Sequence, residues 1–179
     1  MFELSLHILD LVQNSISAGA TLVTIEILID EEKNELIIVI IDDGCGMDEA
    51  LLARVTSPFA TTRTTRKVGL GIPMIKQSAE MCGGSFSIES APGVGTTLRA
   101  AFEDAHVDRP PLGDLTGTMQ ALILGAPDKP DFVLRHVKNG SEFLFDTREV
   151  REVLGGMSLA EPAVLQWIKS AIDEGLTQS

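Results

Sequence analysis

Two short glycine-containing segments constrain this chain more than any other feature of its sequence. The first, IIDDGCGM, occupies residues 40–47, and the second, VGLGIPMIK, occupies residues 68–76. Glycine permits positive φ and close approach of the backbone, so nearby main-chain N–H groups can point at anionic oxygens. The second segment runs into a helix-like sequence, whose N-terminus also favours an anion. Asp42 adds a fixed acceptor at the end of an apolar run. Together these features predict a nucleotide site.

The composition predicts one medium-sized domain, or one domain with a small appendage, around an aliphatic core. Of the 179 residues, 44% are hydrophobic, 22% are charged and 4% are aromatic, and tyrosine is absent. The net charge of −12 argues against nucleic acid or an anionic membrane as a partner. Four basic residues nevertheless lie between the two glycine segments. A cluster of this kind is suited to bind a triphosphate; the alternative is that the segment is a solvated loop. The four residues are Arg54, Arg63, Arg66 and Lys67.

The cysteines and the hydropathy indicate a cytoplasmic protein. Cys45 and Cys82 have neither the spacing of metal ligands nor the density of a secreted disulfide scaffold. Cys45 is expected to be a small apolar filler rather than a redox-sensitive thiol. The sequence shows neither a signal peptide nor an apolar stretch of membrane-spanning length, so we expect no membrane partner.

Hydrophobic periodicity predicts an α/β layer in the first part of the chain. A helix is expected over residues 3–18, because Ile8, Val12 and Ile16 share one of its faces. The β-branched runs at 22–29 and 36–41 predict two strands. The remaining expected elements are a helix at 49–54, a loop at 55–68, a helix at 72–82, and strands at 85–90 and 96–102.

A Pro- and Gly-rich stretch over residues 104–118 indicates a boundary. We therefore expect a domain at 1–104, a linker at 105–117, and a small α+β region at 118–179 that docks a partner. In that region LILG, residues 122–125, is expected to begin a strand. The further elements expected there are a hairpin of 131–137 with 141–146, a helix capped by Asp146, and a helix from Ser158 to about residue 174.

Five motifs occur in a single order along the chain. They are HILDLVQNSISAGAT, IIDDGCGM, SPFATT, KVGLGIPMIK and GTTLRAAF. In this order and at this spacing they resemble the N, G1, F, G2 and G3 boxes of the GHKL ATPase superfamily. That superfamily unites sensor histidine kinase catalytic domains, type II topoisomerases, the large heat-shock chaperones and the mismatch-repair MutL proteins. The first two boxes look most like MutL, and the later ones most like a histidine kinase.

The resemblance implies a fold and a ligand. The fold is an α/β two-layer sandwich of the Bergerat type, with a mixed, mostly antiparallel sheet and helices on one face, here followed by a small α+β C-terminal appendage. The ligand is ATP with Mg²⁺, held between the helical layer and a lid. Adenine specificity is implied by Asp42, which matches the family's acceptor for the adenine amino group; a carboxylate discriminates against the oxo group of guanine.

The resemblance also implies roles for other residues. Asn14 matches the amide that coordinates the Mg²⁺ bridging the phosphates, a suitable hard-oxygen ligand. Thr97 matches the threonine of the last box near the base, with Thr96 as the weaker choice. Further implied contacts are the base-side glycines Gly44 and Gly46, and the phosphate-side residues Lys67, Gly69, Leu70 and Gly71, with Arg63 and Arg66 as additional phosphate contacts.

Catalysis is less clear from the motifs. Asp10 stands four residues before Asn14, where ATP-hydrolysing relatives have a Glu that orients the attacking water. Asp10 either serves as the general base or, being one methylene shorter, stays too far from the water. A histidine kinase also has a dimerisation domain, which carries the phosphoacceptor His, before the N box. Only about a dozen residues precede Asn14 here, which is too few for such a helical domain, so we expect it to be missing. His7 is expected to be a packing or capping residue.

We therefore expect a stand-alone Mg-ATP-binding protein that resembles a histidine kinase catalytic domain and acts on a separate protein partner, with a homodimer as a further option. Two alternatives stay open. One is a slow, MutL-like ATPase switch in which ATP closes a lid. The other is a non-catalytic module that only senses ATP, which the replacement of Glu by Asp10 favours mildly.

Overall fold

The computed structural model describes residues 3–57 and 70–179 of the chain. The described helices and strands are α1 Leu4–Ser17, β1 Leu22–Asp30, β2 Glu35–Asp42, α2 Glu49–Val55, α4 Gly71–Met81, β3 Ser85–Ala91, β4 Gly95–Glu103, α5 Leu115–Gly125, β5 Asp131–Lys138, β6 Ser141–Asp146, α6 Thr147–Leu154 and α7 Pro162–Gln178. The helices and strands expected in the first part of the chain are present, with ends shifted by at most one residue. Most of the loop expected at 55–68 lies outside the described residues. None of the helices in 3–57 and 70–179 has the length and hydropathy needed to cross a bilayer.

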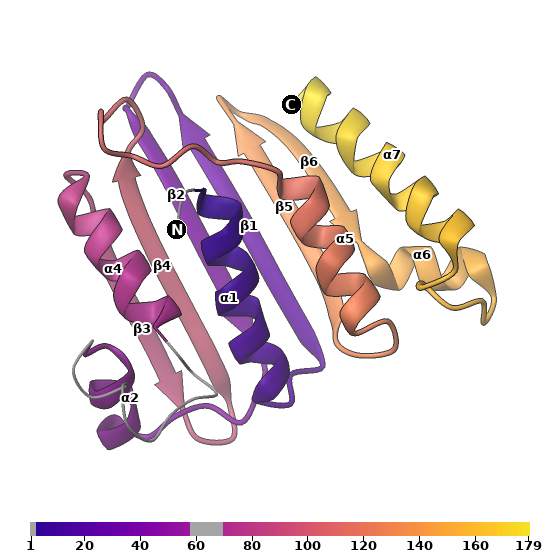
Figure 1. Ribbon diagram of the computed structural model, residues 1–179, viewed down its shortest axis with the longest axis horizontal. Helices are drawn as coiled ribbons and strands as arrows, with labels where there is room; N and C mark the ends of the chain where they lie inside the picture. Colours follow the sequence, from indigo (N-terminus) through magenta and orange to yellow (C-terminus); the bar gives the residue numbers. More distant parts are fainter. Residues whose placement is uncertain (1–2, 58–69) are drawn as a thin grey trace.

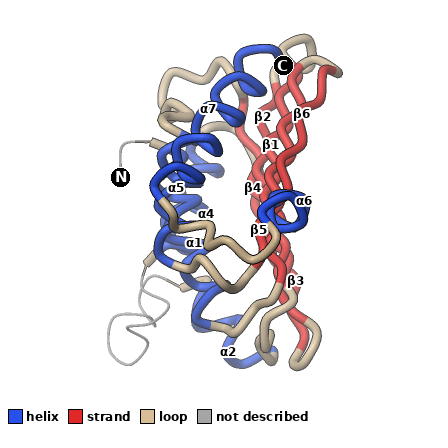
Figure 2. The backbone as a smooth tube through the Cα atoms, turned by 90° about the vertical axis from the view of Figure 1, so that its right-hand side faces the viewer, coloured by secondary structure: helices blue, strands red, loops and turns tan. Residues whose placement is uncertain are grey.

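The described strands form one sheet of six, in the spatial order β3-β4-β2-β1-β5-β6. Neighbouring strands are antiparallel except β1 and β5, which are parallel. Figure 1 and Figure 2 show α1, α4, α5 and α7 in a layer over one face of this sheet. The predicted class, an α/β two-layer sandwich with a mixed, mostly antiparallel sheet and helices on one face, is confirmed.

Alternating aliphatic side chains hold the two layers together. Val23, Ile25 and Ile27 of β1 are completely buried. Because side chains alternate across a strand, they all point into the helical layer. Burying each such side chain contributes about 1.5–3 kcal/mol to the free energy of unfolding. Partners in the same core come from β2 and α1: Leu36, Ile38, Leu4, Ile8, Leu11 and Val12.

The C-terminal region extends this same sheet. β5 pairs with β1 from Leu22 opposite Asp131 to Ile29 opposite Lys138. β6 then forms the far edge. Buried side chains from both parts of the chain belong to one continuous cluster. The division into 1–104, 105–117 and 118–179 stays a prediction, with the added finding that the last part shares the sheet and core of the first.

The strand predicted at LILG was wrong, because residues 122–125 lie in α5. This helix buries Leu115, Met119 and Leu122, which are spaced at i, i+4 and i+7. A short apolar run has no periodicity that separates a buried strand from a buried helix. α5 packs against both α1 and α7, and these contacts bury most of its apolar surface.

The other C-terminal elements follow from turn and cap residues. Asn139 and Gly140 both have positive φ, as a two-residue hairpin turn requires. Asp146 caps α6 by accepting from the Arg148 N–H at 2.9 Å. The start predicted for α7 was wrong: the helix begins at Pro162, whose fixed φ suits the first helical position, and Ser158 bonds Ala160 in the preceding turn instead.

Leu134→Ala tests whether the C-terminal strands share the stability of the whole sheet. Leu134 lies on β5 and is completely buried in the shared core. Its truncation is expected to lower the free energy of unfolding by about 2–5 kcal/mol in one cooperative transition. The measurement is urea unfolding followed by circular dichroism and by the fluorescence of Trp167, the chain's single tryptophan.

Leu144→Ala is the matched control, because Leu144 on β6 is 52% exposed. It should change the free energy of unfolding by less than about 1 kcal/mol. If Leu134→Ala moved the Trp167 signal to lower urea while the circular dichroism midpoint stayed in place, the C-terminal region would unfold separately and the shared core would not be cooperative.

Candidate functional site

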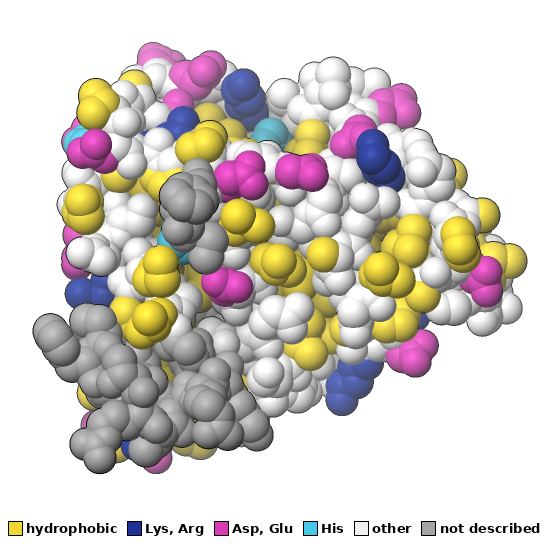
Figure 3. All heavy atoms as spheres, in the orientation of Figure 1, with side chains coloured by type: hydrophobic (Ala, Val, Ile, Leu, Met, Phe, Trp, Pro, Cys, Tyr) yellow, Lys and Arg dark blue, Asp and Glu magenta, His cyan; other side chains and the backbone are white. Residues whose placement is uncertain are grey.

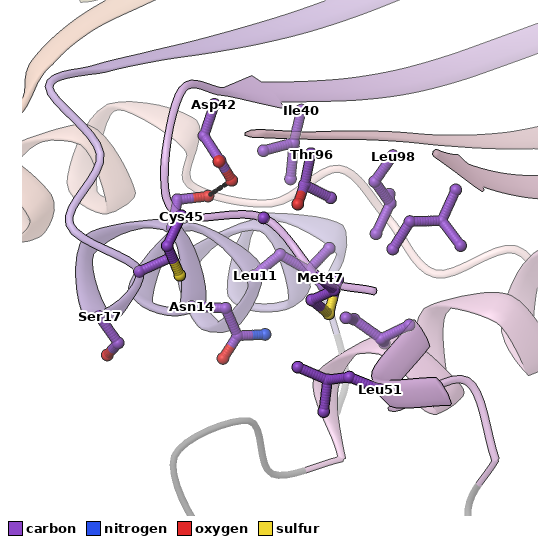
Figure 4. Close-up of a pocket in the computed structure, with 15 residues that line it drawn as sticks. Leu11, Asn14, Ser17, Ile40, Asp42, Cys45, Met47, Leu51, Thr96 and Leu98 are labelled. Carbon is purple, nitrogen blue, oxygen red and sulfur yellow. Dashed lines mark hydrogen bonds between the residues drawn. The ribbon is translucent and has the colours of Figure 1, made fainter. Parts of the chain in front are cut away.

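A cavity of about 210 Å³ lies between α1, the end of β2 and the loop that follows β2. Figure 4 shows Asp42 and Thr96 reaching it from the sheet and Asn14 reaching it from α1. The residues that line it are Leu11, Asn14, Ser15, Ser17, Ala18, Ile40, Asp42, Cys45, Gly46, Met47, Leu51, Ile72, Ile88, Thr96 and Leu98. The structure thus brings together residues from the first, second, fourth and fifth sequence motifs.

Asp42 is held in place on both oxygens. Its Oδ2 accepts from the Ser15 hydroxyl at 2.6 Å, and its Oδ1 accepts from the Gly44 N–H at 2.9 Å. Both bonds fix the orientation of the carboxylate, which keeps further lone pairs for a ligand. Ser15 is buried on α1, next to Asn14, and sequence reasoning missed it. The only sequence feature that points to Ser15 is its position within the first motif.

The neighbouring Asp43 anchors the loop that follows β2. It accepts hydrogen bonds from the Thr21 N–H at 2.7 Å, from the Leu22 N–H at 3.0 Å and from the Thr21 hydroxyl. These bonds tie the loop to the start of β1, and the Thr21 hydroxyl is the main reason that the pKa of Asp43 is lowered. Of the two adjacent carboxylates, only Asp42 lines the cavity.

The first glycine loop approaches its neighbours too closely for larger residues. A Cβ at Gly44 would lie 2.8 Å from the Ala18 Cβ. Gly46 has φ of 71° and a Cβ there would lie 2.0 Å from the Ala91 carbonyl oxygen. The loop therefore packs between α1 and the β3–β4 turn only because both positions are glycine.

Ser90 anchors the far side of the loop. Its hydroxyl accepts from the Met47 N–H at 2.8 Å and donates to the Gly95 carbonyl oxygen at 3.0 Å. The Thr96 hydroxyl lies 2.7 Å from the same Ser90 oxygen. This network joins the loop to β3 and β4 and orients Thr96 at the cavity.

The structure places Thr96, and not Thr97, at the cavity. Thr96 pairs with Asp42 across the β2–β4 ladder and lines the cavity with it. Thr97 pairs with Ile41, is exposed, and faces a separate hollow with Leu22 and Thr24 on the outer face of the sheet. Because consecutive side chains of a strand point to opposite faces, only one of the two threonines can reach the cavity.

Asn14 lies on α1 with its amide at the cavity. The Asn14 Nδ2 atom is buried and has no hydrogen-bond partner among the described residues. An unpaired buried amide costs about 1–3 kcal/mol, and an acceptor placed beside the Asn14 Nδ2 atom would offset that cost. Figure 4 shows this side chain extending from α1 among the residues that line the cavity.

Asp10 and the N-terminus of α4 lie beside each other. Asp10 is exposed and does not line the cavity. A Cβ at the buried Gly71 would lie 3.5 Å from the Asp10 Cβ, so α1 and α4 approach closely there. Leu70 precedes α4 and is 45% exposed, and it too is outside the cavity lining, whereas Ile72 lines it. Four predicted phosphate contacts lie outside the described residues: Arg63, Arg66, Lys67 and Gly69.

The apolar walls of the cavity were not predicted as site residues. Met47 and Leu51 come from the loop and α2, and Ile88 and Leu98 from β3 and β4. Strand alternation makes Leu98 and Ile40 inward-facing, which the sequence shows, but their convergence on one cavity depends on the pairing of β2 with β4.

His7 lies away from this cavity. It is 97% buried on α1, and its burial lowers the pKa of the imidazole. It lines a separate small hollow with Met74 and Asp108. The expectation of a packing residue matches this place.

Comparisons with known proteins agree on one family. Residues 3–106 match the family described as histidine kinase-, DNA gyrase B-, and HSP90-like ATPase. A putative sensor protein of Shewanella frigidimarina is 36% identical over 103 residues, which are 56% of this chain and 16% of that protein. Sensor histidine kinase CitA of Klebsiella pneumoniae is 38% identical over 72 residues, 40% of this chain and 13% of CitA. The chain thus spans only 13–16% of the length of these relatives.

The similarity of the fold extends to solved structures. The ATPase domain of Aquifex aeolicus MutL complexed with ADP matches with a TM-score of 0.52 at 16% identity, covering 87% of this chain and 70% of that one. The N-terminal domain of a DNA repair protein also matches with a TM-score of 0.52, at 18% identity, covering 80% of this chain and 52% of that one. Because the matched segment is more than half of the chain, this protein belongs to the histidine kinase-, DNA gyrase B- and HSP90-like ATPase family, the GHKL ATPases.

Proposed function

We propose that this chain binds Mg-ATP in the cavity beside Asp42 and uses it to act on a separate protein, as a histidine kinase catalytic domain does. Membership of the ATPase family implies ATP binding. The observation that carries the proposal is the Asp42 carboxylate, held by Ser15 and Gly44 at the edge of a largely aliphatic cavity.

The cavity suits an adenine base. Asp42 offers a carboxylate oxygen to the exocyclic amino group, which donates, and disfavours the oxo group of guanine, which accepts. Met47, Leu51 and Ile88 supply apolar surface for the faces of the ring. Thr96, fixed by Ser90, takes the role that the sequence assigned first to Thr97.

The arrangement on α1 suits phosphates with Mg²⁺. The unpaired Asn14 Nδ2 donates to a phosphate oxygen in the proposed complex, and the Asn14 Oδ1 is a hard-oxygen ligand for Mg²⁺. Bound Mg²⁺ would neutralise phosphate charge in a protein whose net charge is −12. Gly71 and Leu70 are the described residues of the proposed phosphate side. Lys67 and Gly69, which lie outside the described residues, are proposed as further phosphate contacts.

A hydrolysing switch is the second candidate, and the position of Asp10 favours it. Asp10 lies one turn before Asn14, exposed beside Gly71, and so on the proposed phosphate side rather than the base side. A general base must come within about 2.6–3.2 Å of the oxygen whose proton it accepts. In this candidate, Asp10 accepts a proton from water, and ATP gives ADP and phosphate.

Asp42→Asn tests the adenine contact. The amide presents a donor where the adenine amino group also donates, and it weakens the bonds to Ser15 and Gly44. We expect ATP affinity to fall about 10- to 100-fold, the size expected for a hydrogen bond to a charged group. Isothermal titration calorimetry with ATP measures the change, and circular dichroism checks folding.

Two neighbouring residues serve as matched controls for this test. Asp43→Asn should lower stability through Thr21 and Leu22 but leave ATP affinity within about twofold. Thr96→Val should weaken ATP binding, whereas Thr97→Val on the outer face should not. Equal ATP affinity for the wild type and Asp42→Asn would refute the placement of adenine.

Asn14→Ala tests the metal side of the site. Wild-type affinity for ATP is expected to be higher with Mg²⁺ than with EDTA, and Asn14→Ala should remove most of that difference while Gln13→Ala, an exposed neighbour, keeps it. The measurement is a calorimetric titration of each variant in both buffers. A full Mg²⁺ response in Asn14→Ala would show that another group holds the ion.

Incubation with γ-labelled ATP separates the candidate functions. The proposed kinase transfers the γ-phosphoryl group to a side chain of a partner encoded by a neighbouring gene and releases ADP, so label appears on the partner. Free phosphate without labelled protein supports the switch, and Asp10→Asn should then slow its release about 100-fold or more at unchanged ATP affinity. Tight binding with neither product contradicts both candidates and leaves a sensing module.

A further inference from the structure

A second and larger cavity, of about 620 Å³, lies at the opposite end of the space between the sheet and the helices. Leu36, at the start of β2, lines this cavity, whereas Asp42, at the end of β2, lines the first. Its walls are the segment 104–116 and the last turns of α7. Figure 3 shows the surface notched along its upper edge, with a basic side chain and a histidine visible at the notch.

The carboxylates around this cavity already have partners. Asp104 pairs with Arg109 at 3.4 Å, and Asp173 accepts from the Thr116 hydroxyl at 2.6 Å. Asp114 caps α5 through the Gly117 N–H at 2.9 Å. The Glu31 carboxylate accepts from the Asn139 amide at 2.8 Å. Asp104 and Asp173 also pair with cations, Arg109 and Lys169, whereas Asp114 and Glu31 bond only neutral donors and keep their charge.

The two cations that line the cavity, Arg109 and Lys138, differ in whether they have hydrogen-bond or ion-pair partners. Arg109 bonds Asp104 and also donates to the Asp104 and Pro110 carbonyl oxygens at 2.6 and 2.8 Å. Lys138, by contrast, is half-buried and makes neither an ion pair nor a side-chain hydrogen bond with any residue of 3–57 or 70–179. A partly desolvated ammonium gains more from an anion than one in bulk water does.

The lining around Lys138 combines polar and aliphatic side chains, and the larger part of its exposed surface is polar. His136 is 95% buried, bonds the Ser179 hydroxyl through Nδ1 at 2.8 Å, and has its pKa lowered by burial and by the charge of Lys138. It is thus a neutral hydrogen-bonding group near neutral pH. The aliphatic lining comes from Ile29, Leu36, Leu112, Leu115 and Leu176.

We propose that this cavity binds a small amphipathic monocarboxylate, with its carboxylate on Lys138 and its carbon chain against the aliphatic lining. The volume falls within the range of small-molecule sites. One unpaired ammonium matches one negative charge, whereas a polyanion would meet the surrounding carboxylates. The site shares no residue with the ATP cavity and stands independently of the proposed function.

Octanoate is the probe for this site, and Lys138→Gln is the test variant. Wild-type protein is expected to bind octanoate in a calorimetric titration, with amide NMR shifts at His136, Leu115 and Thr116. Lys138→Gln should weaken binding about tenfold or more, as expected when an anion loses a charged donor. Lys33→Gln removes the same charge at an exposed position in the nearby β1–β2 turn and should bind as the wild type does.

Ligand controls separate charge from hydrophobicity. Octan-1-ol and octylammonium should bind at least about tenfold more weakly than octanoate, and acetate should bind weakly because it lacks the chain. The proposal is overturned if octanoate fails to bind at millimolar concentration, if octylammonium binds equally well, or if Lys138→Gln and Lys33→Gln have equal affinity. Circular dichroism and the ATP titration establish that both variants are folded.

Discussion

The packing of aliphatic side chains between the sheet and one helical layer is the interaction on which the rest of this structure depends. β1 and β2 alternate strictly, so every second residue enters this layer, and α1 fills it with residues at helical spacing. The inward position at the end of β2 is Asp42, which lines the first cavity. The inward position at the start of β2 is Leu36, which lines the second.

At the first cavity, the two members of each pair of adjacent residues have different contacts. Asp42 faces the cavity while Asp43 fastens the loop to β1. Thr96 faces the cavity while Thr97 faces the outside of the sheet. In each pair one side chain is available for a ligand because of the face it occupies. Ser15 and Gly44 hold Asp42, and Ser90 holds Thr96, so the fold itself positions the side chains that face the cavity.

Much of the fold was predictable because its local signals were strong. The runs of β1 and β2, the Asp48 and Asp146 caps, and the Asn139-Gly140 turn each carry a physical reason for their conformation. The failures occurred where local signals are ambiguous. LILG is apolar in every position, so only its packing between α1 and α7 decides that it is helical. Ser158 was expected to begin the last helix, but Pro162 begins it.

The sequence by itself determined the family, the inward faces of the strands, and the candidate roles of Asn14, Asp42 and the glycines, because these depend on residue type and spacing. Only the tertiary structure decided that Thr96 rather than Thr97 joins Asp42, that Ser15 holds Asp42, and that β5 extends the sheet beside β1. These facts depend on register between strands that are far apart in the chain. The residues that meet across this distance show no periodic pattern within either segment. A local pattern in the sequence therefore does not predict which residues pair.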